Sequence, residues 1–189
     1  MPLRPTGTVM SSQWIGKPVP GRKLGSTSQM RSSIRMQMMK IATRVRDQDG
    51  AALIIDYGHL RSDAGDTFQA IARHSFADPL KNPGQADVTA HVDFQALARA
   101  AEDVGARVHG PVTQGEFLKR LGIETRAVTL MGKTTPEVSG DISAALKRLT
   151  DSGRGGMGSM FKVLAVTEPN LTAVAGLSDE PPAPGDETE

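Results

Sequence analysis

The chain has 189 residues, a formal net charge of +1 and no cysteine; 38% of its residues are hydrophobic and only 4% are aromatic. This length suits a single domain, and the lack of cysteine excludes disulfides, thiolate metal sites and cysteine nucleophiles. No apolar run approaches the roughly 20 residues that a membrane-spanning helix needs.

Positive charge is concentrated at the N-terminal end. Residues 1–46 contain nine Lys and Arg residues and no Asp or Glu, which leaves 13 basic against 21 acidic residues for the rest of the chain. Four prolines and four glycines punctuate residues 1–28, so we expect a disordered basic leader there. Its composition leaves three interpretations open: an organelle-targeting peptide, a nucleic-acid-binding arm, or an unstructured leader with no dedicated role.

A helix is predicted from about residue 28 to residue 46, because Ile34, Met38, Ile41 and Val45 recur at helical spacing. Its other face is basic, which favours a solvated helix packed on a sheet over a nucleic-acid-binding face. Gly50 is expected to stop this helix.

A buried strand is predicted over Ala51–Asp56, directly after the helix. In α/β proteins the carboxyl ends of such strands open into ligand crevices. Asp56, Tyr57 and His59 follow the apolar run, so we consider them candidate catalytic residues. The alternative is a tight turn around Gly58 without a function of its own.

Four polar residues recur with period two shortly afterwards. If the backbone is extended here, Asp87, Thr89, His91 and Asp93 lie on one face, where they are candidate substrate-binding residues. Two histidines and two carboxylates match no recognised metal-ligand spacing, so no metal site is predicted.

The remaining elements complete an α/β pattern. Residues 60–86 show no clean period, and their second half, rich in Pro and Gly, is expected to form a loop. Asp93 is expected to cap the helix that follows it, and Gln114 at another helix entry is a further candidate for substrate binding, although a capping role also fits. The predicted elements are a helix over 94–104, a strand over 107–113, helices over 115–121, 124–131 and 136–149, and a strand over 160–166. Residues 171–189 are expected to form a disordered acidic tail.

Several segments occur together in an order that is specific to one family. They are Gly50-Ala-Ala-Leu-Ile-Ile-Asp-Tyr-Gly-His59, Asp66-Thr67, Asp78-Pro-Leu80, Pro83-Gly84, Ala86-Asp87, Thr89-Ala-His-Val-Asp-Phe94, Gly110-Pro-Val-Thr-Gln-Gly-Glu-Phe-Leu118, Leu121-Gly-Ile123, Met157-Gly158 and Phe161-Lys-Val-Leu164. Over residues 29–170 the chain therefore resembles the C-terminal half of the MidA family of class I S-adenosylmethionine-dependent methyltransferases. The mitochondrial branch of this family is known as an arginine methyltransferase needed for the assembly of respiratory complex I.

The resemblance implies a partial Rossmann-like class I methyltransferase sheet, made of its late strands and a helical insertion. In the family, the cofactor loop lies upstream of the Asp-Tyr-Gly strand, whereas residues 1–28 show no strand followed by a glycine-rich turn. We therefore expect a truncated or frame-disrupted methyltransferase with no cofactor-binding residue of its own, inactive alone and not binding S-adenosylmethionine by itself. Removing the neighbouring strands would leave Ala51–Asp56 as an open apolar edge, which invites a partner chain or a second copy.

Two functions remain open at this stage. The first is a MidA-type protein arginine methyltransferase, with a protein substrate such as a complex I subunit. The second is a non-catalytic protein-interaction module derived from that fold. A nucleic-acid partner would rest on residues 1–46 alone and is disfavoured. The resemblance implies the cytoplasm for a bacterial protein and the mitochondrial matrix for a eukaryotic one.

Overall fold

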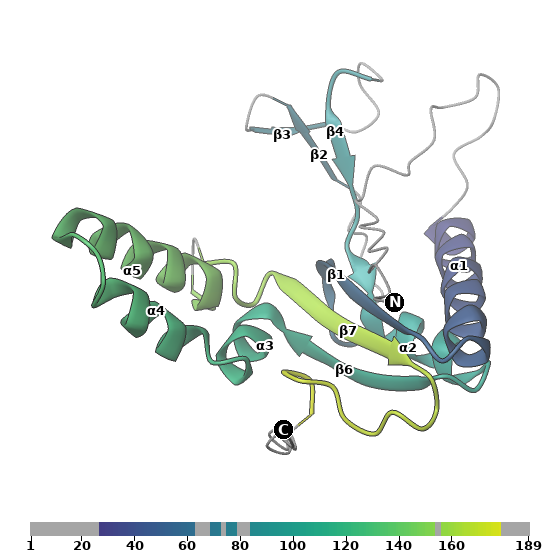
Figure 1. Cartoon of the computed structure of the whole chain (residues 1–189). Coiled ribbons are helices and arrows are strands. Elements are labelled where there is room, and N and C mark those ends of the chain that lie inside the picture. The colour runs from purple at the N-terminus through teal and green to yellow at the C-terminus, as the bar shows by residue number, and fades with distance from the viewer. Residues whose placement is uncertain (1–26, 63–68, 73–74, 79–83, 154–155, 179–189) are drawn as a thin grey trace, which may run out of the picture.

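The computed structural model of the chain describes residues 27–62, 69–72, 75–78, 84–153 and 156–178 (Figure 1). The predicted α/β class is confirmed, and most predicted elements match to within one or two residues. In chain order the elements are α1 (Thr27–Asp47), β1 (Ala51–His59), β2 (Gln69–Ala72), β3 (Ser75–Ala77), β4 (Asp87–Thr89), β5 (Val92–Asp93), α2 (Phe94–Glu102), β6 (Arg107–Thr113), α3 (Gln114–Arg120), α4 (Ile123–Met131), α5 (Pro136–Thr150) and β7 (Phe161–Thr167).

The main sheet has four strands in the order β5-β1-β7-β6. β7 lies at its centre and runs antiparallel to both β1 and β6, while the short β5 runs parallel to β1. The pairing of β1 with β7 is continuous from Ala51, opposite Thr167, to Tyr57, opposite Phe161. β6 is less regular: its register shifts between His109 and Val112, next to Gly110, whose φ is +87°.

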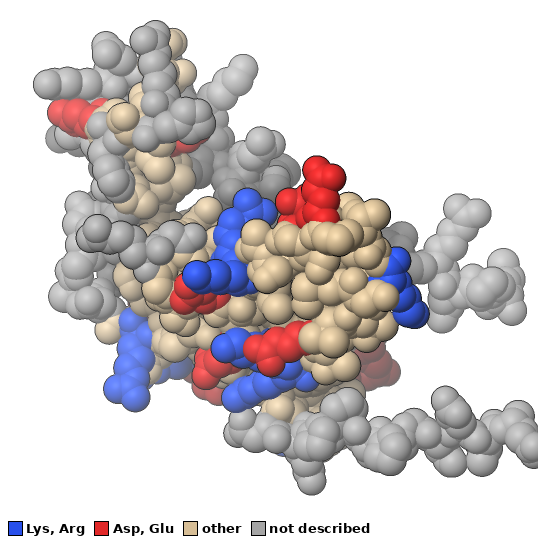
Figure 2. Space-filling view, turned by 90° about the vertical axis from the view of Figure 1, so that its left-hand side faces the viewer, with Lys and Arg blue, Asp and Glu red and all other residues tan. Residues whose placement is uncertain are grey.

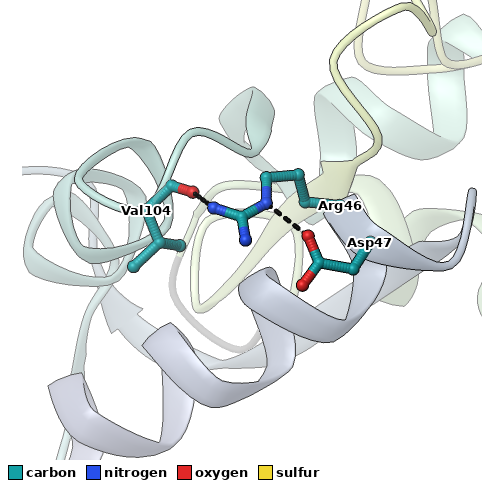
Figure 3. Close-up of polar contacts among 3 residues, drawn as sticks. All are labelled: Arg46, Asp47 and Val104. Carbon is teal, nitrogen blue, oxygen red and sulfur yellow. Dashed lines mark hydrogen bonds and ion pairs between the residues drawn. The ribbon is translucent and has the colours of Figure 1, made fainter.

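Helices α1 and α2 cover one face of this sheet and enclose the main core. The apolar stripe predicted for α1 faces inward at Met38, Ala42 and Val45, and Phe94 of α2 is fully buried beneath them. The pairing of the two helices is reinforced by Arg46, whose guanidinium donates to the carbonyl of Val104 after α2 and to the carboxylate of Asp47 (Figure 3). The other buried members of this core are Leu97, Ala100, Ala101, Ala106, Leu164 and Val166.

The opposite face of the sheet is only partly covered. Residues 171–178 cross it over β7 and β6, and Leu177 is buried there against Val163 and Ala165. These eight residues therefore belong to the folded part of the chain, although the sequence assigns them to an acidic tail. On β1 the same face carries Leu53 and Ile55, which are 53% and 49% exposed.

Two parts of the chain project from the main sheet (Figure 1). One is a separate three-stranded sheet in the order β3-β2-β4, of which β2 and β3 lie within residues 60–86, where the sequence shows no clean period. The other is the arm made of α4 and α5, which is joined to the sheet through α3. Since β1 and β6 both run antiparallel to β7, they are parallel to each other. Both projections therefore follow the same end of the sheet, where the carboxyl ends of β1 and β6 lie.

Two local predictions are wrong. The period-two residues do not share one strand: Asp87 and Thr89 belong to β4, which pairs with β2, whereas Asp93 belongs to β5, which pairs with β1. The chain leaves one sheet and joins the other at Ala90 and His91, which interrupts the extended run. The stop after α1 lies one residue earlier than predicted, because Asp49 has a φ of +50° and takes the left-handed position expected for glycine. The leader over residues 1–26 and the tail beyond residue 178 lie outside the described residues.

None of the helices in the described part of the chain is both long enough and apolar enough to cross a bilayer.

The close contact between β1 and β5 predicts that alanine destabilises the fold at Gly58 but not at Gly140. A Cβ at Gly58 would lie 2.2 Å from the carbonyl oxygen of Val92 and 2.8 Å from the Phe94 ring. We expect Gly58→Ala to lower the free energy of unfolding by about 3 kcal/mol, because backbone and core must both move. In Gly140→Ala, on α5, the new methyl group meets no atom within 4 Å, so that variant should be more stable by about 0.5–1 kcal/mol. Urea denaturation of both variants measures the difference; equal effects would contradict the close approach of β5 to Gly58.

Candidate functional site

The carboxyl end of β1 brings several of the predicted site residues together. Gly58 pairs with Val92, and His59 pairs with Asp93. The close approach of β5 requires glycine at position 58, since any side chain there would meet Val92 and Phe94. Asp93 is the N-cap of α2, and its carboxylate accepts from the amide of Ala96 at 2.9 Å.

A pair of imidazoles lies at this strand end. His91 Nδ1 and His59 Nε2 are 3.3 Å apart, and the ring centroids are separated by 4.8 Å. One ring must donate and the other accept, so a neutral pair satisfies the contact and a doubly protonated pair does not. The pKa of His91 is lowered, first by burial and then by the positive charges of His59 and Lys162. His91 is therefore held toward its neutral form.

Asp56 lies earlier on the same strand and is half-buried. Its carboxylate accepts from the backbone amide of Tyr57 at 2.7 Å. Burial raises the pKa of Asp56, against the opposing effect of that hydrogen bond. The Tyr57 ring is 41% exposed and lies against Phe161, with ring centroids 4.1 Å apart.

The segment that follows β1 is tied to the start of α2. The hydroxyl of Ser62 donates to the carboxylate of Asp93 at 2.9 Å, and its amide donates to the side chain of Gln95, also at 2.9 Å. These two bonds fix the chain where it leaves the strand end toward the small sheet. Asp93 thus has a structural role at two contacts, in addition to any contact with a substrate.

Lys162 is a further candidate site residue, which the sequence pattern did not single out. It pairs with Asp56 across β1 and β7, is only 8% exposed, and donates from Nζ to the carbonyls of Ser159 and Met160. Burial lowers the pKa of this lysine. The sequence feature that could have identified it is its position as the single charged residue within the apolar run Phe161–Val166. A lysine in such a run is predicted to face inward and to have a specific role.

Three of the predicted substrate-binding residues lie elsewhere. Asp87 and Thr89 are exposed on β4 in the separate sheet. Gln114 donates from Nε2 to the carbonyl of Leu149 at 2.9 Å, which joins α3 to α5. Within the described ranges no group of three or more His, Asp or Glu residues is arranged to hold a metal ion.

Comparison with known proteins identifies the family. A family model described as a putative S-adenosyl-L-methionine-dependent methyltransferase matches residues 5–112. The chain belongs to this family. The match begins inside the basic leader, which the sequence pattern alone sets apart from the rest.

The curated relatives are longer than this chain. It is 40% identical over 152 residues to the mitochondrial protein arginine methyltransferase NDUFAF7 homolog of Drosophila melanogaster, covering 79% of this chain and 34% of the relative. It is 36% identical over 129 residues to the mitochondrial protein arginine methyltransferase NDUFAF7 of Danio rerio, covering 68% of this chain and 30% of the relative. The chain thus spans about a third of the length of these relatives.

Two solved structures from Burkholderia thailandensis share the fold. One is an uncharacterised protein with a TM-score of 0.64, and the other is a likely methyl transferase bound to S-adenosyl-homocysteine with a TM-score of 0.62. Each is 27% identical to this chain and covers 77% of it, which is 39% and 38% of their own chains, respectively. The expected class I methyltransferase-like fold is confirmed by these neighbours.

The described residues do not fit S-adenosylmethionine. The resemblance implies that this cofactor is held at a glycine-rich turn that follows a strand. β5 and β6 both lead directly into helices, but Asp93 accepts from the first turn of α2 and Thr113 from the first turn of α3.

A shallow hollow of about 490 Å³ lies at the opposite end of β1, lined by Asp49, Gly50, Ala51, Glu168, Asn170 and Leu171.

The histidine pair predicts a pH dependence. The pKa of His91 is lower in the folded chain than the ordinary value of 6.5, so the unfolded chain binds a proton more readily. The free energy of unfolding therefore decreases as the pH falls below 6.5. We expect the His91 imidazole to titrate below that value in an NMR titration. His59→Gln should move the midpoint upward by removing a positive neighbour, whereas Lys119→Gln, on exposed α3, should leave it unchanged. An equal midpoint in the parent chain and in His59→Gln would contradict the contact.

Proposed function

We propose that this chain supplies the substrate-side part of a protein arginine methyltransferase site, with Asp56, Tyr57, His59 and His91 around the acceptor. The observation that carries the proposal is the contact between His59 and His91 at the carboxyl end of β1. Family membership and the names of the relatives point to S-adenosylmethionine as the methyl donor. The cofactor itself binds to a part of the family fold outside the described residues.

The chemistry of the site suits a guanidinium acceptor. A guanidinium has only donors, so its recognition requires acceptors held in a fixed geometry. The carboxylate of Asp56 and a neutral His91 are such acceptors, and a neutral imidazole can also take the proton that the nitrogen loses on methylation. The bound cofactor supplies an electrophilic methyl group. Transfer requires that methyl group and the nitrogen to be in line at about 3–3.5 Å.

The remaining roles are weaker proposals. Asp93 positions the strand end through α2 and Ser62, and Asp87 and Thr89 present polar groups on the small sheet that projects from the same edge. Gln114 keeps α3 and α5 together rather than contacting the acceptor. Lys162, opposite Asp56, adds a buried positive charge that limits how many cations this site accepts.

The relatives also suggest a substrate and a compartment. They are named mitochondrial protein arginine methyltransferases, which supports a protein substrate and, for a eukaryotic host, the mitochondrial matrix. For a bacterial host we propose the cytoplasm. The family resemblance adds a subunit of respiratory complex I as the acceptor.

A non-catalytic interaction module is the second candidate, and the arm favours it. Val128 on α4 and Val138 on α5 are 65% and 44% exposed, and α5 has no buried residue. Figure 2 shows the face on which the arm lies: uncharged surface is interrupted by side chains of both signs. This mixed pattern suits a protein partner better than a nucleic acid, which requires a basic face.

Calorimetry with S-adenosylmethionine tests whether this chain lacks the cofactor-binding part of the site. After circular dichroism and light scattering have shown a folded, monodisperse chain, titration should give no heat of binding, because Asp93 and Thr113 already accept from a first-turn amide of α2 and of α3, respectively. Binding at micromolar concentration would contradict this expectation and place a complete cofactor site in this chain. The product analogue S-adenosyl-homocysteine serves as the matched second ligand.

A further inference from the structure

Helix α5 turns one side away from the rest of the arm. It packs against α4 and α3, and the half-buried Ile142, Leu146 and Leu149 lie on its inner side (Figure 1). At about 100° per residue, positions three, four and seven apart form one ridge on the opposite side. We name this surface the outer ridge, and all of its members are exposed: Glu137, Gly140, Asp141, Ala144, Lys147 and Arg148.

The outer ridge carries opposite charges at its two ends. Glu137 and Asp141 lie in the first half of α5, and Lys147 and Arg148 lie in its last turn. None of the four takes part in an ion pair between described residues. The helix dipole favours acids at the start of a helix and bases at its end. However, Glu137 and Asp141 are four residues apart and repel each other, so this end of the ridge is stabilised by a cation from outside.

Two small residues occupy the middle of the outer ridge. Glycine inside a helix is destabilising relative to alanine, because it loses more conformational freedom on folding. A Cβ at Gly140 would meet no atom within 4 Å, so packing within the described part of the chain does not require glycine there. Ala144 follows one turn later. Two small side chains in succession allow the axis of another helix to come close to that of α5.

We propose that the outer ridge binds the outer ridge of a second copy of this chain, with the two α5 helices antiparallel about a two-fold axis. In such a pair, centred near residue 142, Glu137 lies opposite Lys147 and Arg148 of the second copy. Gly140 lies opposite Ala144 of the second copy, where the helices come closest. The contact forms twice by symmetry, and it does not depend on the proposed methyl transfer.

A second copy fits this charge order better than other occupants do. The antiparallel arrangement places each acidic half on a basic half, whereas a parallel pair would place acid on acid. A nucleic acid would be repelled by Glu137 and Asp141. The contact is small: α5 has 15 residues, a length of about 22 Å. It therefore buries less than the roughly 1,200 Å² of a stable complex, and we expect a weak dimer.

Sedimentation equilibrium of the whole chain is the first test. We expect a monomer–dimer equilibrium with a dissociation constant between about 10 µM and 1 mM at low salt. Added salt should weaken the dimer, because the exposed charges of the ridge are screened. A chain that stays monomeric up to about 1 mM overturns the proposal.

Charge reversal tests which surface forms the dimer. Glu137→Arg and Arg148→Glu should each weaken self-association at least tenfold, because each places like charges opposite one another. A mixture of the two variants should associate again, since both opposite pairs are restored between unlike chains. The matched control is Glu124→Arg, which reverses the first-turn acid of α4 and should leave the dissociation constant unchanged. Failure of the mixture to recover, or an equal effect of Glu124→Arg, overturns the proposal.

A long side chain at the centre of the ridge provides an independent test. Gly140→Gln should weaken the dimer at least tenfold, because the new side chain keeps the two helices apart. The same variant should be more stable to urea in dilute, monomeric samples, since glutamine favours a helix over glycine. Thr125→Gln, at an exposed position of α4, is the control and should not change the dimer. A dimer that tolerates Gly140→Gln as well as Thr125→Gln uses another surface, such as the edge of β1, and overturns the proposal.

Discussion

The antiparallel pairing of β1 with β7 is the constraint on which the rest of the structure depends. Seven consecutive residue pairs join these strands, and both cores are built on β7: Leu164 and Val166 face α1 and α2, whereas Val163 and Ala165 face residues 171–178. The small sheet follows β1 and the arm follows β6, and both of these strands pair with β7. Pairing with β7 therefore also fixes where the small sheet and the arm begin. Losing this ladder would separate the histidine pair from Lys162.

Much of the fold follows from local patterns that the sequence displays openly. The stripe of α1, the Asp93 cap and the bounds of β6 are set by spacing and capping within a few residues, so they could be predicted. The small sheet could not, because β2, β3 and β4 have three or four residues each and depend on pairing with one another. The prediction that the polar residues of Asp87–Asp93 share one face was wrong, because the chain passes from the small sheet to the main sheet at Ala90 and His91.

Only part of the candidate site's arrangement follows from local patterns. His59 and Asp56 could be assigned because an apolar strand ends there, and His91 because it lies in a polar run nearby. Their mutual contact depends on β5 returning to β1, which no local pattern encodes. Lys162 was missed because β7 is more than a hundred residues away from β1 in sequence, and only the register places it opposite Asp56. The burial that shifts both pKa values toward the neutral forms is a tertiary property.

The bond between the Asp56 carboxylate and the Tyr57 amide takes one backbone donor of β1 away from strand pairing. On this side of β1, β5 pairs only with Gly58 and His59, the two residues that follow Tyr57. A strand extended past them would meet a carboxylate oxygen where it needs an amide donor. The half-buried carboxylate of Asp56 therefore marks the point at which the pairing with β5 ends, independently of any part it plays in chemistry.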